Sequence, residues 1–252
     1  MYKKRLKIII CSVFLILAYH LATIYGGYNI YVLPSLKMIY LSFLELLQTK
    51  ELYKHIYSSL TLVFLGYLIS FFVASILATL SYTTKIKEYY GFLIRFMKNV
   101  PPLSLIPLLI LWFGIRTTPK LIIIILASFF PMYLNMEKGF SYNNKKLIEV
   151  GKAFGFTKSQ IFFKIVLPNA IPDILVGMRI GMGYSYRAII GAEMIAASTG
   201  LGYLINFARS MSRTDIVIVG ILVIGLLGYT CDYLFVVFTT PLLKGRDISE
   251  LN

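Results

Sequence analysis

SSLTLVFLGYLISFFVASILATLSY, residues 58–82, is a stretch of 25 residues without a single charged side chain. About 20 predominantly apolar residues are enough for a helix to cross the hydrocarbon core of a bilayer. Five further stretches meet this requirement, over residues 6–26, 90–114, 119–138, 171–197 and 214–240. The sequence therefore predicts an all-α fold, a polytopic membrane helix bundle of about six transmembrane helices.

The overall composition agrees with a membrane environment. The chain has 252 residues, of which 58% are hydrophobic and 14% are charged. A soluble domain has roughly 45–50% apolar and about 25% charged residues. The net charge of +14 is spread over short basic clusters between apolar runs, and not along one face with stacking aromatic residues. The lipid bilayer is therefore a predicted partner, and nucleic acid is not.

Residue patterns that carry out covalent chemistry are missing from the sequence. Cys11 and Cys231 lie inside apolar runs, and His20 and His55 have no companions at metal-ligand spacing. No Ser/His/Asp arrangement and no phosphate-binding glycine loop is recognisable. We therefore predict no catalytic residue, no metal and no cofactor in this chain, which is expected not to be an enzyme.

The basic residues predict the orientation in the membrane. With the N-terminus inside, sixteen lysines and arginines fall in cytoplasmic segments and seven in outer segments. Cytoplasmic loops of membrane proteins carry the excess of positive charge. Both termini are therefore predicted to be cytoplasmic, in a multi-pass protein of the cell membrane. The first span is long and lacks a convincing cleavage site, so a retained anchor is favoured over a signal peptide.

The chain divides into three predicted parts. Residues 1–57 form an N-terminal anchor helix and an outer amphipathic segment, residues 58–240 form the transmembrane domain with a cytoplasmic loop at 140–170, and residues 241–252 form a cytoplasmic tail. In the outer segment, apolar side chains recur at helical spacing: Leu36, Ile39, Tyr40, Phe43 and Leu47. A helix on the outer membrane face and a helix packed on the rim of the bundle both fit this pattern.

The third span contains NVPPLSLIPLLILWFG, residues 99–114, with Pro101, Pro102 and Pro107. Proline removes a backbone donor and clashes with the preceding turn, so the helix should break or kink near residues 99–102. Freed carbonyl groups survive in a membrane only inside protein or beside a wet cavity. The segment is predicted to be either a packing kink or a broken helix beside a translocation path.

The block EVGKAFGFTKSQIFFKIVLP, residues 149–168, is predicted to form two short helices. Asn144 can cap the first, which carries Leu147, Val150 and Phe154 on one stripe. Gly155 can end that helix in a left-handed conformation. Residues 157–160 match a capping box for the second helix, which should stop near Val166, before Pro168. An apolar stripe that faces neither membrane nor core indicates a protein partner.

The same block resembles a known motif. Glu149, Gly155, Ile165, Leu167 and Pro168 match the spacing of the EAA loop, E-A-A-x3-G-x9-I-x-L-P, of ABC importer permeases, with Val150 and Gly151 in place of the two alanines. Segments 101–115, 130–139, 191–205 and 214–234 look like the nitrate/sulfonate/taurine branch of these permeases. The similarity covers roughly residues 30–240.

The resemblance implies the permease subunit of an ATP-driven importer. Such a subunit forms a homodimer, joins a cytoplasmic dimer of ABC ATPases that binds the ATP, and receives a small solute from an extracytoplasmic binding protein or lipoprotein. Residues 144–155 would enter a groove on the ATPase, where Glu149 would pair with a basic residue and Gly155 would set the angle between the two helices. The residues predicted to couple the permease to the ATPase are Leu147, Glu149, Val150, Gly151, Phe154, Gly155, Leu167 and Pro168. The stripe residues Leu147, Val150 and Phe154 are expected from the pattern alone. The alternative is a secondary transporter or channel that works without an ATPase, in which Glu149→Lys would be harmless.

The fifth span carries the charged residues Asp173, Arg179, Arg187 and Glu193. Asp173 and Arg179 lie near its inner end, where pairing or snorkelling would explain them. Arg187 lies about 24 Å along the helix from residue 171 at 1.5 Å per residue. It departs from the usual uncharged or aromatic residue of the family.

Two hypotheses for Arg187 remain open. One is an anchor for the anionic head of a sulfonate or carboxylate, which favours an organic anion as cargo. The other is an ion pair with Glu193 of the partner subunit. The predicted substrate-path residues are Arg187, Glu193, Pro102 and Pro107. The glycine-rich STGLGY, residues 198–203, is predicted to be an outer gate, a docking loop or an ordinary turn.

Overall fold

The computed structural model describes residues 2–84, 86–141 and 145–243. Every element in these ranges is helical. In chain order the elements are α1 (Tyr2–Tyr25), α2 (Leu36–Gln48), α3 (Glu51–Thr83), α4 (Lys87–Met97), η1 (Pro102–Leu105), α5 (Ile106–Phe113), α6 (Thr117–Ser141), α7 (Lys145–Ala153), α8 (Lys158–Ile161), η2 (Phe162–Val166), α9 (Leu167–Ile195), α10 (Leu201–Ser210), α11 (Thr214–Thr239) and η3 (Thr240–Leu243). From residue 244 on, the predicted tail lies outside the described residues.

Four helices of the described part are long and apolar enough to cross a membrane. They are α3, α6, the continuous helix Lys158–Ile195 made by α8, η2 and α9, and α11. The number rises to five when α4 and the η1–α5 pair are counted as one broken span, and α1 contributes only the shorter apolar helix Val13–Tyr25. The all-helical membrane fold is therefore confirmed with four to five candidate spans, and the count of about six stays a prediction.

The centre of the bundle is α6, which packs most extensively against α9 and next against α3. Its buried side chains Met132, Tyr133 and Met136 are at most 1% exposed. Small residues of the neighbouring helices, among them Ala74 on α3 and Ala170 on α9, are fully buried in the same core cluster. Since lipid is as apolar as the core, close packing of small and large side chains holds such helices together.

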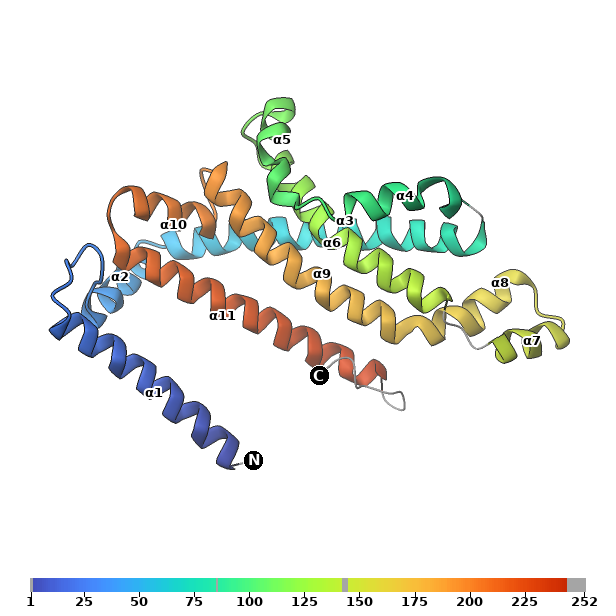
Figure 1. Cartoon of the computed structure of the whole chain (residues 1–252), viewed down its shortest axis with the longest axis horizontal. Helices are drawn as coiled ribbons and strands as arrows, with labels where there is room; N and C mark the ends of the chain where they lie inside the picture. The colour runs from blue at the N-terminus through green and yellow to red at the C-terminus, as the bar shows by residue number, and fades with distance from the viewer. Residues whose placement is uncertain (1, 85, 142–144, 244–252) are drawn as a thin grey trace.

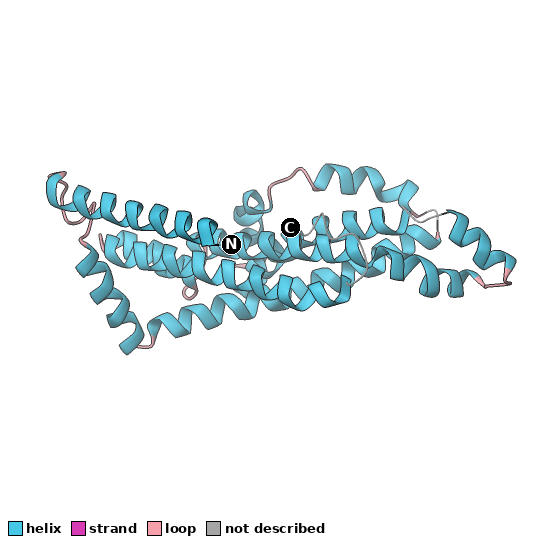
Figure 2. Cartoon of the chain, turned by 90° about the horizontal axis from the view of Figure 1, so that it is seen from below, coloured by secondary structure: helices cyan, strands magenta, loops and turns pink. Residues whose placement is uncertain are grey.

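The two ends of the long axis carry different elements. Figure 1 shows α7 and α8 at one end and α2 and α10 at the other, while α5 projects from the side of the bundle. Seen from below in Figure 2, most helices follow the same long axis. The block at 149–168 and the glycine-rich segment at 198–203 therefore lie at opposite ends of the molecule.

The third predicted span is broken as expected. α4 and the η1–α5 pair meet at an angle of 88°, and Pro101 between them is extended with φ −61° and ψ 122°. Pro107 causes no break, because it sits in the first turn of α5, where a backbone N–H has no partner within the helix. The proline pair at 101–102 is thus the site of the break.

The amphipathic segment that was predicted to lie outside is packed on the rim of the bundle. The hydroxyl group of Ser35 caps α2 by accepting a hydrogen bond from the N–H of Met38 (3.4 Å). Ile39, Phe43 and Leu47 pack against a core cluster shared with α3, α10 and α11, whereas Tyr40 is 61% exposed. Of the two predicted arrangements, the structure has the packed one. The transmembrane domain was predicted to begin at residue 58, but α3 already begins at Glu51. Residues 51–57, the last of the predicted outer segment, therefore belong to α3.

Candidate functional site

The EAA-like block forms the predicted helical hairpin. α7 ends at Ala153, and Gly155 follows with φ +74°. The hydroxyl group of Thr157 accepts from the N–H of Gln160 (3.2 Å), and the side-chain oxygen of Gln160 accepts from the N–H of Thr157 (2.8 Å). This reciprocal pair is the predicted capping box. Asn144, the predicted cap of the first helix, lies outside the described residues.

One side of α7 and the residue after it is exposed. Leu147, Val150 and Phe154, the predicted stripe, are 44%, 50% and 78% exposed, and Glu149, which is not part of the stripe, is exposed as well. On the other side of the helix, Ile148 packs against the main core cluster. The structure therefore leaves four of the predicted coupling residues exposed on α7 and at its end, and we call them together the α7 face (Leu147, Glu149, Val150 and Phe154).

The other predicted coupling residues lie in the joint behind this face. Gly151 is buried, and a Cβ at this position would lie 2.7 Å from the Cδ1 atom of Ile165. Its carbonyl group accepts a hydrogen bond from the N–H of Phe156 (3.0 Å). Leu167 and Pro168 are half-buried at the start of α9. Gly151 thus allows α7 to lie close against η2, and it does not belong to the open surface.

The prediction that the second helix stops before Pro168 is wrong. The helix continues from Lys158 to Ile195 through η2, a π-helical turn, and the N–H of Leu167 bonds to the carbonyl of Phe162. A proline lacks the N–H for an intrahelical bond, and its ring clashes with the carbonyl group four residues earlier. A wider π turn removes this conflict locally. The hairpin is therefore joined to α9 without a break.

The two charged residues near the inner end of the fifth span are paired, as one of the predicted explanations required. The guanidinium group of Arg179 donates to both carboxylate oxygens of Asp232, each at 2.8 Å. The ammonium group of Lys138 lies 3.0 Å from the carboxylate of Asp173. Both pairs join α9 to a neighbouring helix, so these charges have a structural explanation.

Arg187 differs from them. It is exposed, and no carboxylate of the described residues lies within ion-pair distance of it. It lines a hollow of about 480 Å³ together with Pro102 at the break of the third span. Pro107 is exposed on α5 and does not line this hollow. The structure thus brings together two of the four predicted path residues, Arg187 and Pro102.

Glu193 is occupied within its own chain. Its side chain is 1% exposed, and its carboxylate accepts from the hydroxyl group of Ser59 (2.8 Å) and the N–H of Gly202 (3.0 Å). Two of its lone pairs are therefore used at the N-terminus of α10, where a negative charge is favourable. The hypothesis that Glu193 of the partner subunit pairs with Arg187 does not fit this burial, because the carboxylate is not presented to a second chain.

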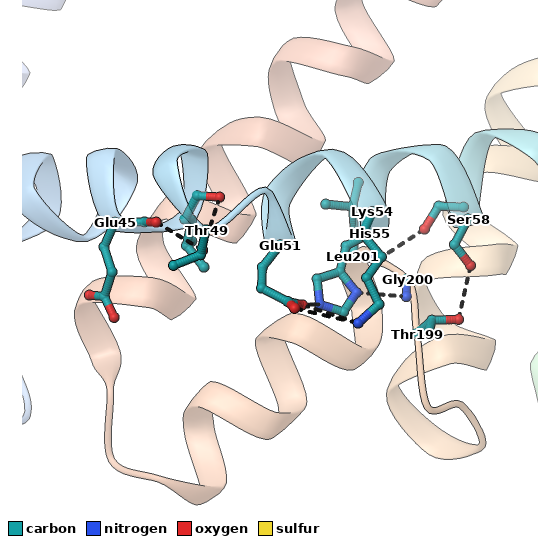
Figure 3. Close-up of polar contacts among 11 residues, drawn as sticks. Glu45, Thr49, Glu51, Lys54, His55, Ser58, Thr199, Gly200 and Leu201 are labelled. Atoms are coloured by element: carbon teal, nitrogen blue, oxygen red, sulfur yellow. Dashed lines mark hydrogen bonds and ion pairs between the residues drawn. The ribbon is translucent and has the colours of Figure 1, made fainter.

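The glycine-rich segment 198–203 ends in a helix start that the sequence analysis missed. Gly200 has φ +113°, and its N–H donates to Nδ1 of His55 (3.0 Å). The N–H of Leu201, the first residue of α10, donates to the hydroxyl group of Ser59 (2.9 Å). Figure 3 shows His55 between Glu51 and this turn, and Ser58 beside Thr199. The partners lie more than 130 residues apart in sequence, so no local pattern could have revealed them.

The comparisons with known proteins agree with this arrangement. The profile of the family described as binding-protein-dependent transport system inner membrane component matches residues 66–240. SsuC of Bacillus subtilis (strain 168), named as an aliphatic sulfonates transport permease protein, is 34% identical over 220 residues, which cover 87% of this chain and 80% of SsuC. The taurine transport system permease protein TauC of Escherichia coli (strain K12) is 35% identical over 140 residues, which cover 56% of this chain and 51% of TauC.

The fold is also similar to a solved structure. A chain of the inward-facing MetNI methionine ABC transporter superimposes with a TM-score of 0.69 at 15% sequence identity, and the match covers 77% of this chain and 97% of that chain. At this identity the likeness concerns the fold alone. The chain therefore belongs to the family of binding-protein-dependent transport system inner membrane components, and it is the permease of an ABC importer and not its catalytic subunit.

Proposed function

We propose that two copies of this permease form the membrane path of an importer for a small organic anion, and that the α7 face docks on a cytoplasmic ABC ATPase. An extracytoplasmic binding protein would deliver the anion to the opposite end. The observation that carries the proposal is the exposed apolar stripe of α7, on a helix that also exposes Glu149, at one tip of the bundle.

The α7 face has the composition of a docking helix. An amphipathic helix that enters a groove presents apolar anchors at successive turns, and aromatic residues are enriched among the anchors with the largest binding energy. Phe154 is the most exposed of the three apolar side chains, so we assign it the central position in the ATPase groove. Glu149 would pair with a basic residue at the rim of that groove.

The hairpin can pass a movement on to the centre of the bundle. The capping box and Gly151 hold α7 against the second helix, and that helix runs without a break into α9, which packs most extensively against α6. A displacement of α7 by the closing ATPases would therefore tilt α9 as a rigid body. Domain closures of the hinge and shear type work in this way.

The orientation that we propose places α7 and both termini in the cytoplasm, with α1 as a sixth span. The ratio of sixteen to seven basic residues supports it. Figure 1 adds that α1 begins, and α11 ends, on the side away from α2 and α10. In this orientation the hydrogen-bonded turn at Gly200 lies at the outer end, where the binding protein would dock.

An organic sulfonate is the cargo that we favour. Two relatives are named for aliphatic sulfonates and for taurine, which is itself a sulfonate. Arg187 has no carboxylate partner among the described residues, and a guanidinium group suits the oxygens of such an anion. We therefore assign Arg187 to the path of the anion.

Capture of the ATPase tests the docking proposal. We expect Phe154→Ala to abolish co-purification of the cognate ABC ATPase, because removal of a central anchor weakens binding by about 2 kcal/mol or more, roughly thirtyfold. Phe92→Ala is the matched control, since Phe92 is 76% exposed on α4. Equal capture of the ATPase by both variants would refute docking through α7.

Uptake of a radiolabelled alkanesulfonate by the complete importer in proteoliposomes tests the cargo. Arg187→Gln should abolish this uptake while the ATPase still co-purifies, and Arg209→Gln, which removes an exposed arginine of α10, should not change it. Unchanged uptake by the Arg187→Gln variant would remove Arg187 from the path. A wild-type importer that moves no organic anion would refute the cargo class.

A further inference from the structure

The hollow beside Arg187 has walls from three elements that are far apart in sequence. Pro102 and Leu103 come from the break of the third span, Phe130 comes from α6, and Tyr184 comes from α9. Its volume of about 480 Å³ lies within the roughly 300–1,000 Å³ of small-molecule sites. The break at 99–102 is what opens this wall, because the chain leaves the direction of α4 there.

Two cations line this hollow, and no carboxylate does. One is Arg187 on α9, and the other is Lys98 at the end of α4. Neither side chain lies within ion-pair distance of a carboxylate of the described residues. Lys87, also on α4, contrasts with them, because it is paired with Glu137. Among the described residues, the nearest carboxylates belong to adjoining hollows, with Glu88 and Glu137 on the side of Lys98 and Asp232 on the side of Arg187, so this hollow itself is lined by positive charge alone.

The remaining lining is mainly apolar. Leu126 and Phe130 come from α6 and Ile180 from α9, while the half-exposed Tyr184 of α9 is a further lining residue and carries a hydroxyl group. A carboxylate or sulfonate head needs charged or polar donors, and a hydrocarbon tail gains free energy by leaving water. A ligand with both parts matches the hollow better than an inorganic anion does.

We propose that this hollow is a binding site for an aliphatic organic anion, in which Lys98, Tyr184 and Arg187 hold the charged head and the side chains of α6 and α9 hold the tail. The inference rests on the proposed cargo class and deepens it, because it adds Lys98 and Tyr184 as binding residues. It also makes tail length a determinant of recognition by the permease itself.

Equilibrium dialysis tests the site without any partner protein. The probe is radiolabelled 1-hexanesulfonate, offered to the full-length permease in lipid nanodiscs, with empty nanodiscs as the correction for lipid partitioning. We expect saturable binding that Lys98→Gln and Arg187→Gln each weaken about tenfold or more, since a hydrogen bond to a charged group contributes roughly 1.5–3 kcal/mol. Tyr184→Phe should weaken it less. Lys37→Gln and Arg209→Gln remove exposed cations outside the hollow and should leave it unchanged.

Changes in the probe separate the head from the tail. Shortening to ethanesulfonate should weaken binding about fourfold for each methylene removed, and hexyltrimethylammonium, which carries the opposite charge, should not bind. Equal affinity of wild type, Lys98→Gln and Arg187→Gln for hexanesulfonate would overturn the proposal. Absence of saturable binding to wild type, or equal binding of the cationic probe, would do the same.

The outcome is independent of ATPase docking, because the assay contains no ATPase. If Arg187→Gln abolishes uptake but Lys98→Gln leaves the affinity for hexanesulfonate unchanged, this site is refuted while the proposed function stands.

Discussion

The two ends of the bundle differ in how their side chains are placed: at one end polar side chains are buried and hydrogen-bonded, and at the other end apolar side chains are exposed. At the α10 end, Ser59, Glu193 and His55 are 0%, 1% and 4% exposed, and each is hydrogen-bonded to the turn around Gly200 or to the start of α10. At the α7 end, by contrast, Val150 and Phe154 are 50% and 78% exposed.

The difference shows which end is complete in the single chain. A buried carboxylate is strongly destabilising unless donors surround it, and the donors of Glu193 come from α3 and α10 of the same molecule. An exposed apolar stripe is relieved only when another surface covers it. The α10 end is therefore satisfied within the chain, whereas the α7 face is left open for the ATPase that we propose as its partner.

The largest effect on stability is expected when a methyl group is added to Gly200 at the α10 end, which we call the closed end. Gly200 has φ +113° and ψ 165°, and a Cβ there would lie 2.1 Å from the carboxylate carbon of Glu193. Gly200→Ala should therefore lower the unfolding free energy by about 2–6 kcal/mol, from backbone strain and overpacking of about 1–3 kcal/mol each. The measurement is the thermal unfolding midpoint of the purified permease in detergent.

Gly155→Ala is the matched change at the α7 end, which we call the open end. Gly155 also has positive φ, at +74°, but nothing lies within 4 Å of the position of its Cβ. Gly155→Ala should therefore lower the unfolding free energy by backbone strain alone, about 1–2 kcal/mol. Equal losses at the two glycines would show that the closed end is not the more constrained one.

Much of the fold could be predicted from the sequence because its signals are local. The uncharged stretch at 58–82 lies inside α3, the proline pair at 101–102 marks the break of the third span, and residues 157–160 form the predicted capping box. The stripe of α7 followed from helical spacing alone, and three of its residues are exposed as expected for a docking surface.

The remaining features depend on contacts between distant residues. Glu193 was predicted to lie on the substrate path, but its partner Ser59 is 134 residues away, and only the packed structure shows that it caps α10. Pro168 was predicted to end a helix, since the sequence does not show that a π turn precedes it. Lys98 entered the sequence analysis only as a topology signal, because the hollow that it lines together with Arg187 is formed by residues far apart in sequence.

Charge reversal on the α7 face tests function without touching the fold. Glu149 is exposed, so Glu149→Lys should leave the unfolding midpoint unchanged. It should reduce uptake by at least about tenfold, because loss of a charge pair in an interface weakens association by roughly 2–5 kcal/mol. Proteoliposomes that contain the permease, the ATPase and the binding protein provide the measurement.

Glu88→Lys is the control for this reversal, since Glu88 is an exposed carboxylate of α4 outside the hairpin. Normal uptake by Glu149→Lys would show that Glu149 takes no part in the coupling to the ATPase.

The smallest effect is expected at the turn that joins α7 to α8. Thr157→Ala removes the oxygen that accepts from the N–H of Gln160, while the bond from the N–H of Thr157 to Gln160 can remain. A lost N-cap costs about 1 kcal/mol, so the amide of Gln160 should exchange its hydrogen about fivefold faster while the amides of α6 and α9 do not change. Thr157→Ser keeps the acceptor oxygen and should restore the slow exchange. Because this turn joins α7 to the helix that continues into α9, the looser joint should also reduce uptake, by less than Glu149→Lys does. A stable joint with normal uptake in the alanine variant would mean that the packing of Gly151 against Ile165, and not the cap, holds the hairpin to the bundle.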